Sequence, residues 1–109
     1  MSRESEWLDF ILHDDFPSDV EFLEGNRSNH VIVRWQVADR DDSLRRNTPM
    51  VIVIDVGAIN RHETSDVIEQ TRIEKRIREI VAVRMVQYDP LGPVDVPEPF
   101  VIQIDEGDL

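Results

Sequence analysis

Residues 49–57 read Pro-Met-Val-Ile-Val-Ile-Asp-Val-Gly, and this stretch decides the fold. Met50 to Ile54 are all apolar, so the strand that they predict has no polar residue on either face before Asp55. A strand that is apolar on both faces is typical of the centre of a sheet with cover on both sides. Gly57 breaks the strand, and a helix is predicted to begin between residues 60 and 65.

Before this strand, the pattern predicts two further strands. Val31, Val33, Trp35 and Val37 alternate with polar residues, which indicates one strand over residues 31–37. A short strand over residues 20–23 precedes it, and the glycine and asparagines of residues 25–29 are typical of a hairpin loop between the two. Residues 39–48 form a charged connection with Leu44 as its one apolar residue.

Helices are predicted at the start of the chain and after the apolar strand. Ser2 is a suitable cap for a helix that ends before Pro17, with Trp7, Leu8, Ile11 and Leu12 as its apolar stripe. The later helix has Ile73, Ile77, Ile80 and Val81 on one face. Residues 81–86 also alternate like a strand, but no turn residue separates them from the helix, so we extend the helix to about Val86.

A proline-rich linker over residues 90–99 leads to a last strand, Phe100 to Ile104. The element order α-β-β-β-α-β predicts an α+β fold: one two-layer domain over residues 1–109, with a mixed four-stranded sheet and two helices. Residues 1–2 and 105–109 are expected to fray.

Composition and charge exclude several classes of function. The chain has no cysteine, which rules out disulfides, thiolate metal sites and a thiol nucleophile and fits a reducing cytoplasm. Nothing at its start resembles a signal peptide, so we expect a cytoplasmic protein, and its eleven arginines against one lysine suggest a GC-rich bacterial genome. Of the net charge of −11, residues 1–30 carry −6 and residues 89–109 another −6. That charge argues against general binding of nucleic acid or membranes.

Two clusters contain residues of the metal-ligand type. His62 and Asp66 lie four residues apart, so on a helix they would share one face and could share a metal ion. The same stretch also predicts a helix start, with Thr64, Ser65 or Asp66 as the cap. His13-Asp14-Asp15 is a second such cluster, at the end of the first helix.

The string Ile54-Asp55-Val56-Gly57 resembles the first phosphate loop of sugar kinases and actin-like ATPases, in which the aspartate helps to hold the metal. The likeness covers four residues, and those families need two large lobes, which 109 residues do not supply. We therefore expect Asp55 to meet water or cap a turn at the end of its strand.

The charged connection is the strongest candidate for a binding site, and a solvated flexible connector is the alternative interpretation of the same residues. Its paired charges suit protein recognition, because arginine forks to carboxylates, and we select Arg40, Asp42, Arg45 and Arg46. The predicted function is a non-enzymatic, protein-binding or regulatory module without a cofactor, steered by its acidic ends to a basic protein partner. The alternatives are a small metal-dependent enzyme with a site near Asp55, His62 and Asp66, and a homo-oligomeric structural protein.

Overall fold

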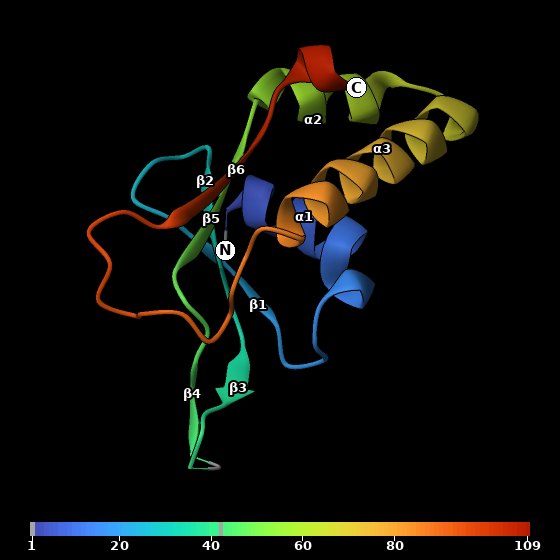
Figure 1. Ribbon diagram of the computed structural model, residues 1–109. Helices are drawn as coiled ribbons and strands as arrows, with labels where there is room; N and C mark the ends of the chain where they lie inside the picture. Colours follow the sequence, from blue (N-terminus) through green and yellow to red (C-terminus); the bar gives the residue numbers. More distant parts are fainter. Residues whose placement is uncertain (1, 42) are drawn as a thin grey trace.

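Strands form where the sequence alternates or is wholly apolar, and helices form where apolar residues recur every three or four positions. The computed structural model describes residues 2–41 and 43–109. Its helices are α1 (Arg3–Leu12), α2 (Val56–Thr64) and α3 (Val67–Met85), with 3₁₀ turns at His13–Asp15 and Glu106–Asp108. Its strands are β1 (Glu21–Glu24), β2 (His30–Arg34), β3 (Gln36–Ala38), β4 (Leu44–Arg46), β5 (Met50–Ile54) and β6 (Phe100–Ile104) (Figure 1).

Four of the strands form one mixed sheet in the order β1-β2-β5-β6. β2 pairs antiparallel with both β1 and β5, whereas β5 and β6 are parallel neighbours. The wholly apolar strand β5 therefore lies inside the sheet, and β1 and β6 are its edges. The predicted α+β fold with a mixed four-stranded sheet is confirmed.

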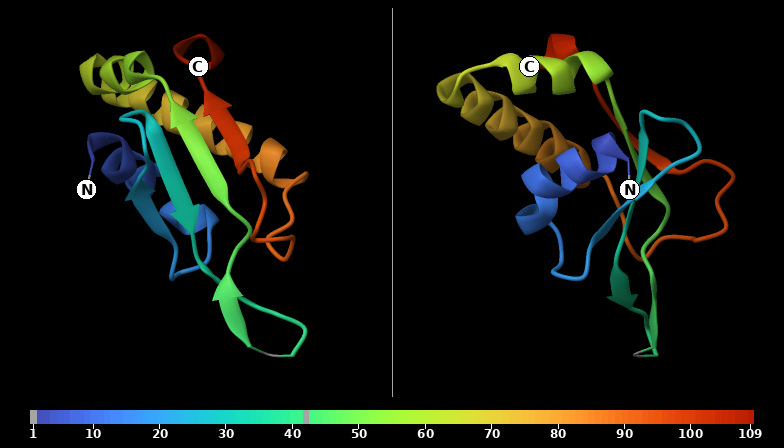
Figure 2. Two further views of the ribbon diagram at one scale, coloured as in Figure 1. Left: turned by 90° about the vertical axis from the view of Figure 1, so that its left-hand side faces the viewer. Right: turned by 180° about the vertical axis from the view of Figure 1, so that it is seen from behind.

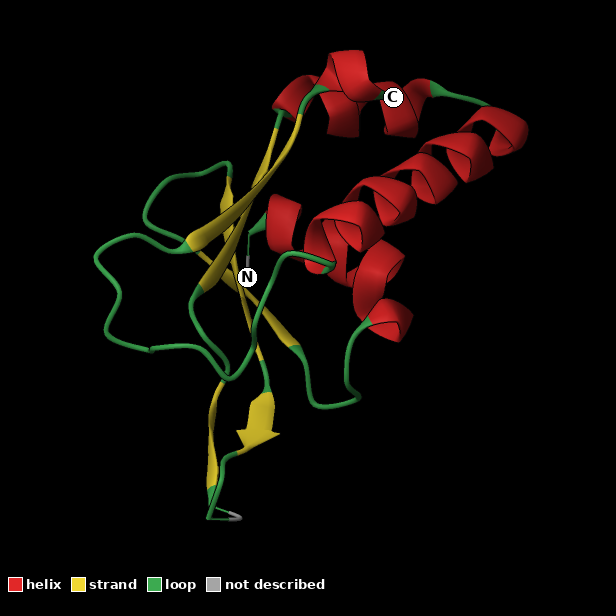
Figure 3. Cartoon of the chain, viewed as in Figure 1, coloured by secondary structure: helices red, strands yellow, loops and turns green. Residues whose placement is uncertain are grey.

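The hydrophobic core lies between one face of this sheet and the helices (Figure 3). Met50, Ile52 and Ile54 of β5 point into it and are fully buried. The predicted stripe of α1 covers them from one side, and Ile73, Ile77 and Val81 of α3 complete the layer. Each large apolar side chain buried in this way contributes about 1.5–3 kcal/mol to stability.

None of the described helices lies on the opposite face of the sheet, so the expected cover on both sides of β5 is wrong as far as helices are concerned (Figure 2). One apolar row crosses the four strands on this open face and consists of Leu23, Ile32, Val51 and Val101. They are half-buried, apart from Val101, which is 39% exposed. An antiparallel or mixed sheet tolerates one solvated face, and helices on a single side are enough to form its core.

The second predicted helix is in fact two helices, which makes three in the described chain instead of two. α2 begins at Val56, directly after the cap Asp55, and α3 begins after the cap Asp66. Gly57 does not break the chain but lies in the first turn of α2, where a Cβ would collide with the Glu106 carboxylate. The C-terminal boundary is as predicted, because α3 ends at Met85 with Val86 as its cap.

β3 and β4 form a separate two-stranded hairpin, here called the hairpin arm (residues 36–46). It lies at one end of a molecule that measures 49 × 25 × 24 Å along its principal axes (Figure 1). The predicted strand over residues 31–37 is thus interrupted at Trp35. The predicted connection over residues 39–48 is wrong in part, since Leu44–Arg46 is a strand.

The last five residues, for which we expected fraying, fold back onto α2. Asp105 and Asp108 form a reciprocal capping box around the final 3₁₀ turn. Arg61 Nη1 donates to the Leu109 carbonyl oxygen at 3.2 Å, and Arg76 Nε donates to that of Asp108 at 2.9 Å. Within the described residues, no helix combines the length and the apolar character that crossing a membrane requires.

Candidate protein-binding site

The residues predicted for protein binding all belong to the hairpin arm, but they have different surroundings. Asp42 lies outside the described residues. Arg40 is exposed in the turn before it, while Arg45 and Arg46 lie on β4. The structure therefore places the three described arginines on one hairpin and gives each a different role.

Arg45 anchors the arm to the rest of the protein. Its Nε lies 3.2 Å from Oδ2 of Asp39, and its Nη2 donates to the carbonyl oxygen of Gly92 at 3.0 Å. Gly92 belongs to the linker before β6, so this side chain ties the arm to a segment far along the chain. Arg45 is thus occupied within the molecule.

Asn47, which the sequence analysis did not select, forms the junction between the arm and the body. Its buried Oδ1 accepts the Trp35 backbone N–H at 2.8 Å, and its Nδ2 donates to the Tyr88 hydroxyl oxygen at 2.8 Å. Tyr88 in turn donates to the carbonyl oxygen of Thr48. Burial raises the pKa of Tyr88, although the hydrogen bond from Asn47 lowers it in part.

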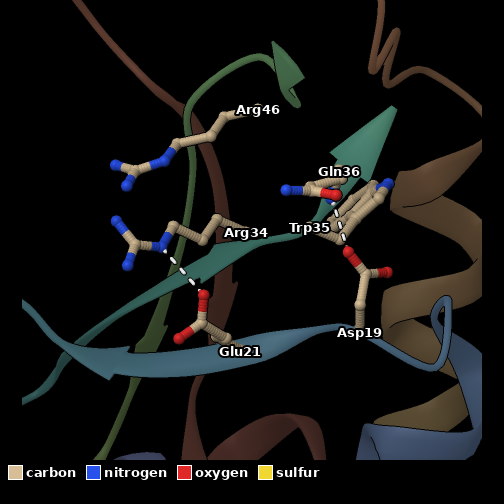
Figure 4. Close-up of a pocket in the computed structure, with 6 residues that line it drawn as sticks. All are labelled: Asp19, Glu21, Arg34, Trp35, Gln36 and Arg46. Atoms are coloured by element: carbon tan, nitrogen blue, oxygen red, sulfur yellow. Dashed lines mark hydrogen bonds and ion pairs between the residues drawn. The ribbon is translucent and has the colours of Figure 1, made fainter. Parts of the chain in front are cut away.

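Arg46 and Arg34 lie together at the base of the arm. Both line a hollow of about 310 Å³ whose other lining residues are Asp19, Glu21, Trp35 and Gln36. Figure 4 shows the two guanidinium groups on the same side of this hollow. Arg34 Nε donates to Oε1 of Glu21 at 3.3 Å, whereas Arg46 makes no ion pair with any residue that the structure describes.

A second hollow, of about 360 Å³, shares Arg34 and Arg46 with the first one. Its lining is mostly apolar and includes Pro49, Ile32 of the open sheet face and Val94 of the linker. Val94 is 47% exposed. Arg34 and Arg46 therefore line both a polar hollow and an apolar one.

Leu44 is the exposed apolar residue of the arm, with 65% of its surface accessible. It lies opposite Ala38 in the β3–β4 pair, where no core residue is near enough to cover it. Single exposed apolar residues are common on proteins, so exposure alone does not make Leu44 a contact residue. Its position beside the arginines of the arm is what makes it a candidate.

The residues of the alternative metal site have separate roles. Asp55 caps α2, because its Oδ1 accepts the Gly57 N–H at 3.0 Å, as expected for a strand-end aspartate. Asp66 caps α3 by accepting the Glu69 N–H at 2.8 Å. Across residues 2–41 and 43–109, no three His, Asp or Glu side chains are grouped as metal ligands would be.

His62 is buried in a hydrogen-bonded chain between α1 and α3. The Trp7 indole donates to Nδ1 of His62 at 3.2 Å, and Nε2 of His62 lies 2.8 Å from Oε2 of Glu74. Because an indole N–H only donates, Nδ1 is the acceptor and the ring hydrogen is on Nε2, directed at the carboxylate. His13 is elsewhere, with its Nδ1 2.8 Å from Oδ1 of Asp9.

The remaining charges divide into paired and unpaired regions. On α3, Arg72 pairs with Glu69 and Arg76 with Glu79, and the Arg72 hydrogen bond holds the pKa of Glu69 below its ordinary value. All six acids of residues 89–109, by contrast, lack an ion pair with a described residue. Charge is therefore compensated along α3 and uncompensated along the linker and tail.

No family model matches the chain, and no curated protein and no solved structure matches it either.

Proposed function

We propose that this domain acts by binding another protein and that the hairpin arm is its contact surface. The observation that carries the proposal is the arm itself, a hairpin that stands beyond the core and, among its described residues, packs only Val37 against it. Fixing the backbone costs about 1–2 kcal/mol per residue, and little burial offsets that cost here. A contact outside the domain accounts for both the arm and its exposed Leu44.

The overall charge favours a partner that is basic as a whole. The unpaired acids of the linker and tail add to a net charge of −11, and such a field speeds the approach of a positively charged protein. The arm differs from the acidic termini, because its residues 36–46 hold three acids and three arginines and are close to neutral. Steering acts over distances up to about the Debye length and reflects the charge of the whole surface, so it does not dictate the sign of the contacts at the arm.

The test compares two exposed apolar residues that differ in position. Leu44→Ser removes the apolar side chain of the arm, and Ile68→Ser makes a similar change at the start of α3, where Ile68 is 83% exposed. Neither change removes buried surface, so both variants should melt at the temperature of the parent protein. Affinity purification from the native host should retain the partner with Ile68→Ser and lose it with Leu44→Ser.

Equal retention by both variants would contradict the proposal. A light-scattering mass measured on the same samples covers the remaining case: a parent dimer that Leu44→Ser turns into a monomer would identify the arm as a contact between copies of this chain.

A further inference from the structure

The two arginines at the base of the arm offer hydrogen-bond donors that the protein does not use. Arg34 donates a hydrogen bond from its Nε to Glu21, and no hydrogen bond from its terminal amines is found within the described residues. The guanidinium of Arg46 has neither an ion pair nor a hydrogen bond within residues 2–41 and 43–109. Arg34 and Arg46 line one hollow together with Asp19 and Glu21, and an anion of a partner would accept from the guanidinium donors that these two acids leave free.

We propose that Arg34 and Arg46 bind a carboxylate of the protein partner, and that an apolar side chain next to this carboxylate lies in the second hollow. The inference rests on the proposed function and specifies the chemistry of the contact. The ligand is therefore an acidic residue adjoining an apolar one, in an exposed segment of the partner.

The charge of the first hollow selects a carboxylate over a phosphate. Asp19 and Glu21 line it together with the two arginines, and Asp19 is held in place because its Oδ2 accepts the Gln36 N–H at 2.8 Å. A singly charged, planar carboxylate matches a guanidinium fork. A phosphate carries close to two charges and would face both acids at short range.

The second hollow supplies the apolar half of the site. Ile32 belongs to the apolar row of the open sheet face, and Pro49 and Val94 line the same hollow. Because this hollow shares Arg34 and Arg46 with the first one, a ligand need only span neighbouring side chains to occupy both. The chain's own C-terminal Leu109 is not such a ligand, since it packs at α2 against Arg61.

The experiment is an NMR titration of the isotope-labelled full chain with the capped tripeptide acetyl-Leu-Glu-Ala-amide. The Nε–H signals of Arg34 and Arg46 and the backbone signals of Ile32 and Val94 should shift together. The matched peptide with glutamine in place of glutamate should not shift them. Both the peptide with phosphoserine in place of glutamate and free 4-methylpentanoate should bind more weakly than the glutamate peptide.

Arg46→Gln is the informative variant, because Arg46 is exposed and its loss leaves no buried partner unsatisfied. Losing a charge-assisted pair is worth about 1.5–3 kcal/mol, so the peptide should bind more than about tenfold more weakly. Arg40→Gln makes the same change in charge at the tip of the arm and should leave the affinity within about twofold of the parent.

Four results would overturn the inference: equal shifts with the glutamine peptide, tighter binding of the phosphoserine peptide, equally tight binding of the free acid, or equal losses with Arg40→Gln and Arg46→Gln. Affinity purification of the partner distinguishes failure of this inference from failure of the proposed function. Capture that depends on Leu44 but not on Arg46 leaves the arm as the contact surface and removes the carboxylate site. Capture that depends on neither removes the arm as well.

Discussion

At the scale of single residues, Asn47 determines where the body of the protein ends and the arm begins. Its amide occupies the place where backbone pairing between β2 and β5 stops, and it satisfies the Trp35 N–H and the Val33 carbonyl oxygen. A buried backbone group without such a partner costs about 1–3 kcal/mol. The sequence does not reveal this junction, because the alternation of residues 31–37 continues through Trp35 and the amide that interrupts it comes from residue 47.

The candidate site was predictable only in part for a similar reason. The charged stretch of residues 39–48 is enough to predict the arginines on the arm as candidates. Arg34 is not predicted in this way, because the sequence shows it only as a polar position of an alternating strand. Arg34 joins Arg46 because the register pairs Val33 with Met50 and Gln36 with Arg46. Register depends on contacts between distant segments, so composition and alternation do not predict it.

Tyr88 provides a pH-dependent test of the junction. Burial favours the neutral phenol and raises its pKa in the folded state, so this stabilisation is complete below the unfolded value of about 10. It is lost as the pH rises through the folded value, because the unfolded chain then releases the proton more readily. The free energy of unfolding should therefore fall above about pH 10 in the parent protein, and Tyr88→Phe should remove that slope while lowering stability near neutral pH.

Absorbance of the tyrosinate measures the ionisation directly, since Tyr88 is the one tyrosine of the chain. A tyrosinate midpoint at or below the ordinary value in the folded protein would contradict the buried junction.

At the scale of elements, the strands of the main sheet were predicted well, and helix boundaries were harder. These strands lie close to their predicted places because alternation reports burial on one face, and because the wholly apolar run of β5 indicates an inner strand. The start of α2 at Val56 was missed because Gly57 indicates a break by its propensity. In the structure Gly57 lies in the first turn of α2, and the Glu106 carboxylate, from the far end of the chain, occupies the place that a Cβ would take.

The contribution of the Asp66 cap at the start of α3 to the free energy of unfolding can be measured. Asp66→Ala removes the cap of α3 and should lower the free energy of unfolding by about 1 kcal/mol, as is typical of lost N-caps. Asp66→Asn keeps an oxygen that accepts the Glu69 N–H and should be close to the parent in urea unfolding. Asp95→Ala, an equal change of charge in the exposed linker, is the control, and a loss as large as that of Asp66→Ala would rule out the cap as the cause.

At the scale of the whole molecule, the distribution of charge follows the long axis. The unpaired acids of the final turn, Asp105, Glu106 and Asp108, lie at the α2 end, and the arm with Arg40 and Arg46 lies at the other (Figure 1). The sequence predicted acidic terminal segments, but only the fold places the arginines opposite the tail. The protein is thus acidic as a whole, whereas the arm that we propose as its contact surface, with three acids and three arginines in residues 36–46, is close to neutral.

The net charge predicts that moderate salt stabilises this protein. Self-repulsion at −11 opposes the compact state, and a Debye length of about 8 Å at physiological ionic strength screens it. The melting temperature should rise from low to moderate NaCl, although the same salt weakens the surface ion pairs. A variant with Asp89→Asn, Asp95→Asn and Glu98→Gln should show a smaller rise, and a melting temperature that falls in the parent would show that the ion pairs dominate.

The parallel pairing of β5 with β6 has a consequence for the protein during its synthesis. β5 is the most apolar segment of the chain, yet one of its two edges has no neighbour until Phe100–Ile104 has emerged from the ribosome. Until then, the nascent chain presents an unpaired apolar strand of the kind that recruits other strands and aggregates. Translation of α2, α3 and the linker is therefore the interval in which the nascent chain is most exposed to aggregation through β5.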